Sequence, residues 1–219
     1  MSAAANSGRR LAVIPMKDPS RAKTRLATAL APQEREALAR GLFRSTIMRL
    51  QEAVAMLPEG AADIAVVSNS PVIARIARQA GLICIDDNDP GTLSLAVEAA
   101  ADWAAAQGYE ALCVLPGDLA DPSPDDLAQL LAYPLDGNST VLCPATDLGT
   151  NALLVPLPCP FAFAYGQKSL IAHRQAAETA GLCPVVLPLD SLRVDVDTAE
   201  DLNCLLAQNP QALAREGAR

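Results

Sequence analysis

The sequence predicts an α/β fold, with a mostly parallel mixed sheet flanked by helices. Short apolar runs, typical of strands buried on both faces, alternate with longer segments of helical periodicity. Hydrophobic residues make up 51% of the chain but aromatic residues only 3%, which favours helices packed on a sheet. With 219 residues we expect one domain over residues 11–208, a flexible N-terminus at 1–10 and a C-terminal tail at 209–219.

Composition excludes several classes of partner. The net charge of −8 argues against nucleic acids and anionic membrane surfaces, because either would require a basic face. No apolar run approaches the ~18 residues of a transmembrane helix, and we expect no secretory signal. The cysteines are scattered without a CxxC pair and read as small buried hydrophobes in a reducing compartment. We therefore expect a cytoplasmic protein.

Strands and helices alternate through the first half of the chain. The run at 11–16 reads as the first buried strand, with Pro15 near its end. Apolar side chains three or four residues apart predict a helix over 32–56. Further strands are expected at 64–67, 82–85 and 111–115, and further helices at 71–80, 92–107 and from Pro124. Such alternation implies right-handed crossovers and parallel strands.

A polar loop at 17–25 follows the first strand. Its cationic side chains, which include Lys17, Lys23 and Arg25, stand out in an acidic protein and could meet the phosphates of a nucleotide. A solvated basic loop is the alternative. The segment contains neither GxxxxGK[ST] nor GxGxxG, so a Walker-type phosphate loop is excluded.

The strand at 111–115 ends at Pro116-Gly117, and Asp118 follows directly. An acidic residue just past the carboxyl end of a central parallel strand lies where open α/β sheets bind ligands. Its carboxylate could hold a cation such as Mg²⁺, which prefers oxygen ligands. The alternative is an aspartate that caps a turn or the next helix.

The second half is less regular. We expect strands at 140–144 and 152–155, an edge strand at 184–187, and helices at 168–180 and 198–208. The segment 193–197 reads as a short strand that places Asp195 and Asp197 on one face, where either could look toward the ligand of Asp118. Asp197 could instead cap the last helix with Thr198. The single histidine, His173, is expected to be structural or solvated and not catalytic.

Several segments, in one order along residues 11–205, carry a family resemblance. They are Pro15-Met-Lys17 with Ala22-Lys-Thr-Arg-Leu26, Gly117-Asp-Leu119, Gly149-Thr-Asn-Ala-Leu-Leu154, Tyr165-Gly166 with Ser169 and His173, and Val194-Asp-Val-Asp-Thr198 with Glu200-Asp-Leu202. In these the chain resembles the guanylyltransferases of deazaflavin cofactor (coenzyme F420) biosynthesis. The resemblance implies a Rossmann-like nucleotidyltransferase sheet of the GT-A kind. It also implies transfer of GMP from GTP to 2-phospho-L-lactate, phosphoenolpyruvate or 3-phospho-D-glycerate, with release of pyrophosphate.

The resemblance also implies roles for individual residues. Asp118, with Asp195 or Asp197, would hold Mg²⁺, and Lys17, Lys23 and Arg25 would neutralise the triphosphate. The acceptor's anionic group would lie at Thr150, Gly166 and Ser169, the last two at a helix N-terminus whose free N–H groups suit an anion. The nucleotide would lie at Ser68, Gly91, Leu93, Pro116 and Gly117. A homodimer is plausible for this fold.

Departures from the family pattern leave the acceptor open. Ala120 stands where the family usually has proline, and Gln167-Lys168 replace an expected glycine. The loop Leu189-Asp-Ser lacks the usual Pro-Gly. The alternatives are a nucleotidyltransferase for a molybdopterin-like or sugar-phosphate acceptor, a noncatalytic nucleotide-binding homologue, and a glycosyltransferase. Against the first, residues 17–25 contain no glycine-rich segment, and against the second, Asp118, Asp195 and Asp197 are all present. Against the third, Asp118 and Asp121 at the strand end are separated by two residues and do not form an Asp-x-Asp motif.

Overall fold

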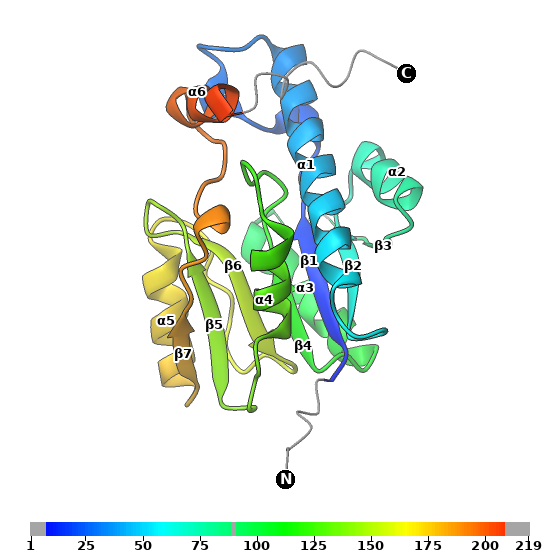
Figure 1. The fold of residues 1–219 in the computed structure, drawn as a ribbon, viewed down its shortest axis with the longest axis vertical. Helices are drawn as coiled ribbons and strands as arrows, with labels where there is room; N and C mark the ends of the chain where they lie inside the picture. Colours follow the sequence, from blue (N-terminus) through cyan, green and yellow to red (C-terminus); the bar gives the residue numbers. More distant parts are fainter. Residues whose placement is uncertain (1–7, 89–90, 209–219) are drawn as a thin grey trace.

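The computed structural model describes residues 8–88 and 91–208, and these form one mixed seven-stranded sheet with helices on both faces (Figure 1). The tail expected at 209–219 and residues 1–7 of the expected flexible N-terminus lie outside the described residues. The first strand begins at Arg10, one residue earlier than the expected domain boundary, and Arg10 is buried in it.

The strand order in the sheet is β3-β2-β1-β4-β6-β5-β7. All neighbouring strands are parallel except β6, which runs antiparallel to both β4 and β5. The mostly parallel mixed sheet predicted from the sequence is confirmed, and β7 lies at an edge as expected. The strands are β1 (Arg10–Pro15), β2 (Ala62–Val67), β3 (Ile83–Ile85), β4 (Ala111–Val114), β5 (Ser139–Pro144), β6 (Thr150–Pro156) and β7 (Cys183–Val186).

Each face of the sheet has its own core. Along β1, Ala12 and Ile14 pack toward α1, α2 and α4, whereas Leu11 and Val13 pack toward α3. This alternation follows from the two-residue period of a strand, and it explains why β1 is apolar from Leu11 to Pro15. The helix α5 packs on β5 and β7. The helices are α1 (Pro32–Ala55), α2 (Pro71–Gln79), α3 (Leu93–Ala106), α4 (Pro124–Ala132), α5 (Ser169–Thr179) and α6 (Ala199–Gln208).

A third, smaller core joins the end of the chain to its beginning. Leu202 and Leu205 of α6 pack with Val196 and with Leu26 and Leu38 near the start of α1. Figure 1 shows α6 beside the first turns of α1, far from the other helices of the second half. This packing holds the segment before α6 over the carboxyl edge of the parallel strands.

Two expectations from the sequence are wrong. The segment 193–197 is not a strand: it makes a single bridge, between Asp195 and Leu119, because it runs along the loop after β4 and not beside a sheet strand. Only some of the cysteines are buried as expected. Cys84, Cys183 and Cys204 are exposed, because apolar runs near sheet edges and on α6 still present one side to water. No helix in the described ranges combines the length and apolarity needed to span a bilayer.

Candidate active site

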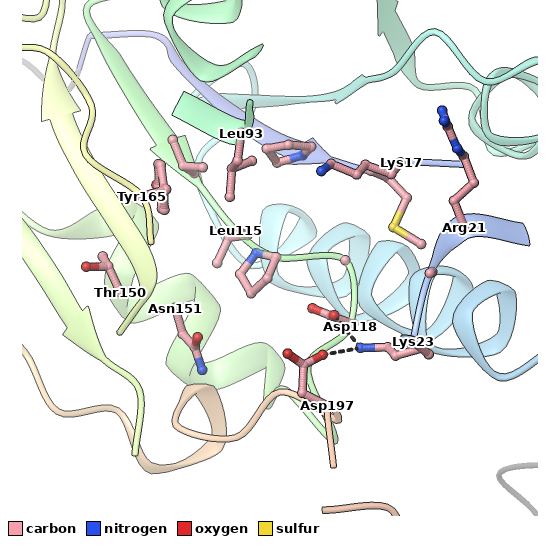
Figure 2. Close-up of a pocket in the computed structure, with 16 residues that line it drawn as sticks. Lys17, Arg21, Lys23, Leu93, Leu115, Asp118, Thr150, Asn151, Tyr165 and Asp197 are labelled. Atoms are coloured by element: carbon pink, nitrogen blue, oxygen red, sulfur yellow. Dashed lines mark hydrogen bonds and ion pairs between the residues drawn. The ribbon is translucent and has the colours of Figure 1, made fainter. Parts of the chain in front are cut away.

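Two contiguous cavities lie at the carboxyl edge of the parallel strands, and Figure 2 shows the residues that line the first. One, of about 410 Å³, extends over Asp118 to Thr150, because antiparallel β6 begins at the edge where β4 ends. The other, of about 480 Å³, extends to Asn69 and Gly91 beyond the ends of β2 and β3. The two cavities share the lining residues Pro15, Met16, Lys17, Arg21 and Leu93. The cleft can therefore hold two ligands end to end.

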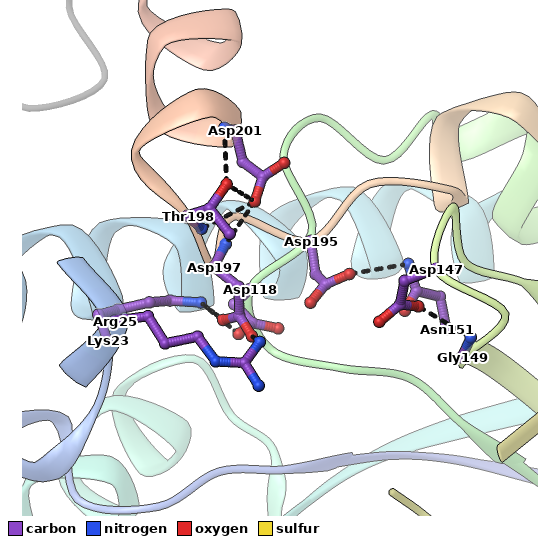
Figure 3. A network of polar contacts seen from close by, with 10 residues as sticks. All are labelled: Lys23, Arg25, Asp118, Asp147, Gly149, Asn151, Asp195, Asp197, Thr198 and Asp201. Atoms are coloured by element: carbon purple, nitrogen blue, oxygen red, sulfur yellow. Dashed lines mark hydrogen bonds and ion pairs between the residues drawn. The ribbon is translucent and has the colours of Figure 1, made fainter. Parts of the chain in front are cut away.

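Lys23 joins two of the predicted carboxylates. Its Nζ donates to Asp118 Oδ2 and, at 3.1 Å, to Asp197 Oδ1 (Figures 2 and 3). The Lys23 side chain is only 3% exposed. Burial on its own would lower the pKa of this ammonium group, but Asp118 and Asp197 outweigh burial and raise it. Lys23 is therefore a buried, charged lysine at neutral pH.

Backbone pairing between distant segments brings three carboxylates together. Leu119 and Asp195 form their single bridge, and the Val196 amide donates to the Asp118 carbonyl at 3.1 Å. Asp118, Asp195 and Asp197 consequently converge (Figure 3). Burial, reinforced by the charges of Asp118 and Asp197, raises the pKa of Asp195. The cluster is thus short of positive charge despite Lys23.

The hydrogen bonds at the start of α6 show that the side chains of Thr198 and Asp201, and not that of Asp197, cap this helix. Thr198 Oγ1 accepts the Asp201 amide at 3.3 Å, and Asp201 Oδ2 accepts the Thr198 amide at 2.8 Å. Asp197 is left to face Lys23 and Arg25, whose guanidinium lies 3.5 Å from Asp197 Oδ2. Arg25 itself is 73% exposed, so water screens this second pair.

The other predicted residues of the nucleotide side divide into two groups. Lys17, Gly91, Leu93, Pro116 and Gly117 line one or both cavities. Gly117 is closely surrounded there, because a Cβ would lie 3.1 Å from Met16 Sδ and from Phe43 Cδ2. Ser68 forms the second group, because it lines neither cavity: it is buried and accepts the Ser70 amide at 3.1 Å. Its neighbour Asn69 lines the second cavity instead.

A neutral network lies at the other end of the cleft. Thr150 lines the first cavity, and its backbone amide donates to Ser169 Oγ at 2.9 Å. Thr150 Oγ1 also lies 3.1 Å from Nδ1 of His173, which is completely buried. Gly166 lies just before α5, with φ of 144°, and its carbonyl accepts the Ser169 amide at 3.2 Å. The three residues predicted to hold the acceptor lie together, but of these only Thr150 lines either cavity. The expected free N–H groups at the start of α5 are not found, because the first amides of this helix already donate to backbone carbonyls.

Sequence reasoning did not assign roles to several residues of the cleft. Asn151 follows Thr150 on β6 and donates to the Leu192 carbonyl at 2.9 Å and to Asp195 at 3.4 Å. Asp87 and Thr92 line the second cavity, and Tyr165 lines the first. Asn151 and Tyr165 lie directly beside predicted site residues in the sequence, and Thr92 lies within the predicted segment 91–93, whereas Asp87 carried no such signal.

Comparison with known proteins agrees with this geometry. A family model described as "Guanylyl transferase CofC like" matches residues 10–217. The chain belongs to this guanylyltransferase family. A member named 3-phospho-D-glycerate guanylyltransferase, from Colwellia psychrerythraea, is 36% identical over 88% of this chain and 89% of its own length. A member named phosphoenolpyruvate guanylyltransferase, from Rubrobacter xylanophilus, is 33% identical over 87% of this chain and 90% of its own.

The fold is shared more widely than the family. The structure of a nucleotidyl transferase from Methanothermobacter thermautotrophicus superposes with a TM-score of 0.61 at 14% identity. That match covers 92% of this chain and 99% of the other. The guanylyltransferase family is thus built on the nucleotidyltransferase sheet of the GT-A kind that the sequence predicted.

Proposed function

We propose that this chain transfers GMP from GTP to a phosphorylated three-carbon acid and releases pyrophosphate, a step of coenzyme F420 biosynthesis. The acids are 3-phospho-D-glycerate, phosphoenolpyruvate and 2-phospho-L-lactate. Family membership supports the reaction type. The observation that carries the proposal is the convergence of Asp118, Asp197 and Lys23 in the first of two contiguous cavities at the carboxyl edge of the sheet.

The chemistry needs no protein nucleophile. The acceptor's phosphate is already anionic near neutral pH, and one of its oxygens attacks the α-phosphorus of GTP. The bond from the α-phosphorus to the bridging oxygen breaks, and pyrophosphate leaves with that electron pair. The protein must align two polyanions and offset their repulsion, for which Lys17, Lys23 and Arg25 are suited.

The second cavity suits the base and the first suits the acceptor. Asn69 and Asp87 line the second cavity, and a carboxylate and a carboxamide complement the N–H donors and the carbonyl on the edge of guanine. The first cavity ends at Thr150. In this placement the phosphates of GTP lie over the shared lining of Lys17 and Arg21, next to Asp118.

Mg²⁺ fits the donor set through two carboxylates. Within residues 8–88 and 91–208, no three or more His, Cys, Asp or Glu side chains gather closely enough to hold a metal ion. Asp118 and Asp197, however, already share one cation, the Lys23 ammonium. Mg²⁺ usually binds through one or two carboxylates and substrate phosphates, so these two would hold it and Asp195 would stand beside it. Bound there, it would screen phosphate charge.

The proposal is tested by a panel of reactions. Each of the three acids is mixed with GTP and Mg²⁺, and pyrophosphate release is measured, with ATP, CTP and UTP in place of GTP as controls. We expect GTP to be the preferred nucleotide and one acid to be clearly the best acceptor. Faster release with another nucleotide would contradict the proposed base, and release with none of the acids would contradict the proposed reaction.

A further inference from the structure

His173 is a buried group beside the cleft whose role the proposed reaction leaves open. It is 0% exposed on α5, and its Nε2 accepts the Ala164 amide at 2.9 Å. A backbone amide can only donate, so Nε2 carries no proton. Burial lowers the pKa of His173 to about 4, so the ring is neutral near pH 7. Its single proton therefore lies on Nδ1.

That proton determines how Thr150 is hydrogen-bonded. The His173 Nδ1–H can only donate, so Thr150 Oγ1, 3.1 Å away, accepts. Ser169 Oγ accepts the Thr150 amide at 2.9 Å and donates its own proton to Thr150 Oγ1 at 3.2 Å. Either hydroxyl of the Ser169–Thr150 pair can donate to the other. With Ser169 as the donor, the Thr150 proton is left for a ligand of the first cavity, which Thr150 lines.

We propose that His173 is a positioning residue whose Nδ1–H donates to Thr150 and so turns the Thr150 hydroxyl proton toward the anionic group of the acceptor. A threonine hydroxyl can normally rotate between donating and accepting. In this network the chain Ala164 amide, His173 ring and Thr150 hydroxyl runs in one direction only, and an anion accepts at its end. This inference rests on the proposed function, because it concerns that reaction's acceptor.

Two substitutions test the two nitrogens of the imidazole ring independently. In His173→Asn the side-chain amide takes the place of Nδ1–H and can still donate to Thr150, but it cannot reach the Ala164 amide. In His173→Gln the terminal oxygen takes the place of Nε2 and can accept the Ala164 amide, but no donor remains at Thr150. We expect His173→Gln to raise the acceptor KM about tenfold, as for loss of one aligned hydrogen bond to a charged group. The KM for GTP should stay unchanged, and His173→Asn should affect the acceptor KM much less.

A merely structural role of His173, in holding the Ala164 segment, predicts the reverse order of the two variants. Arg174→Ala, on the exposed side of α5, is the matched control and should leave both KM values unchanged. Thr150→Val removes the hydroxyl at nearly constant volume. In that background His173→Gln should have no further effect on the acceptor KM, whereas additive effects would overturn the proposal.

A spectroscopic measurement tests the tautomer without turnover. Because the chain contains one histidine, ¹⁵N-histidine labelling gives a single imidazole. We expect a protonated Nδ1 and an unprotonated Nε2, and an Nδ1 shift that moves when the preferred acid is added. A protonated Nε2 would overturn the proposal even if the enzyme is active. If the wild-type enzyme transfers GMP to no acid, the proposed function fails, and this inference fails with it.

Discussion

The two ends of the cleft are built from opposite kinds of interaction. At the phosphate end, a buried lysine lies between carboxylates that are partly open to water, since the Asp118 and Asp197 side chains are 26% and 41% exposed. At the acceptor end, Thr150, Ser169 and His173 are neutral, buried and joined by hydrogen bonds. The first arrangement pairs opposite charges, whereas the second joins neutral groups by directional hydrogen bonds. We infer that charge handling resides at the first end and acceptor recognition at the second.

The largest effect is expected at the phosphate end. Asp118→Asn keeps the size of the side chain but removes its charge, both as a partner of Lys23 and as an oxygen ligand. We expect the turnover number to fall by about 10³-fold or more, in the range of losses seen when a key electrostatic group is removed. Pyrophosphate release under saturating substrates measures this, and circular dichroism checks the fold. A variant with near wild-type turnover would rule out a role for Asp118 in the reaction.

Lys23→Met tests the same end from the cationic side. Without the ammonium group the three carboxylates repel one another, so we expect turnover to fall by about 10²-fold and stability to fall by roughly 1–3 kcal/mol at pH 8. The expected loss of stability is moderate because Asp197 is partly solvated. Asp195, whose pKa is raised by burial and by the neighbouring charges, is the carboxylate whose protonation relieves this repulsion, so the stability difference from wild type should shrink toward pH 5. Denaturant unfolding at the two pH values measures this difference, and one that grows toward pH 5 would contradict a repulsion between carboxylates as its cause.

Substitution of Asp195 is expected to change stability less than Lys23→Met does, and to increase it. Burial, together with Asp118 and Asp197, raises its pKa in the folded state. The folded state therefore favours protonated Asp195, and ionising it costs stability as the pH rises above the pKa of the unfolded chain. Asp195→Asn removes that cost, so we expect the variant to melt at a higher temperature than wild type at pH 8. At pH 4 the gain should be smaller. Thermal unfolding at both pH values tests the prediction, and equal gains would show that ionisation of Asp195 is not the cause.

The smallest effect is expected for Arg25. Its guanidinium is 73% exposed, and exposed ion pairs contribute about 0–1 kcal/mol. Arg25→Ala should leave the unfolding free energy nearly unchanged and raise the KM for GTP by only about threefold to tenfold. Steady-state kinetics at low salt, where surface charges are least screened, give the clearest reading. A loss as large as that of Lys23→Met would show that exposure is a poor guide to the role of these cations.

The sequence predicted most of the fold but only part of the difference between the charged and the neutral regions of the cleft. Strands such as β1 and β4 were found because they are continuous apolar runs, and Ser123 before Pro124 marked the start of α4. The resemblance and strand-end position pointed to Asp118 and Thr150. The burial of Lys23 could not be predicted from the sequence, because its partners Asp118 and Asp197 lie 95 and 174 residues away in the chain.

The acceptor end shows the same limit for a different reason. His173 was expected to be structural or solvated, and the helix pattern alone could not show which residues face its two nitrogens. Those partners come from the loop before α5 and from β6, so they depend on how the second half of the sheet is assembled. The segment 193–197 was misread because alternating valines and aspartates imitate a strand.

Our central claim is that the two ends of the cleft hold GTP and a phosphorylated acid so that the acid's phosphate attacks GTP. Phosphorus NMR of the enzyme with GTP, Mg²⁺ and the preferred acid tests this most directly. We predict that the acid's monophosphate signal is replaced by two mutually coupled diphosphate signals, with one pyrophosphate formed for each. Pyrophosphate formed while the acid's signal stays unchanged would contradict this claim.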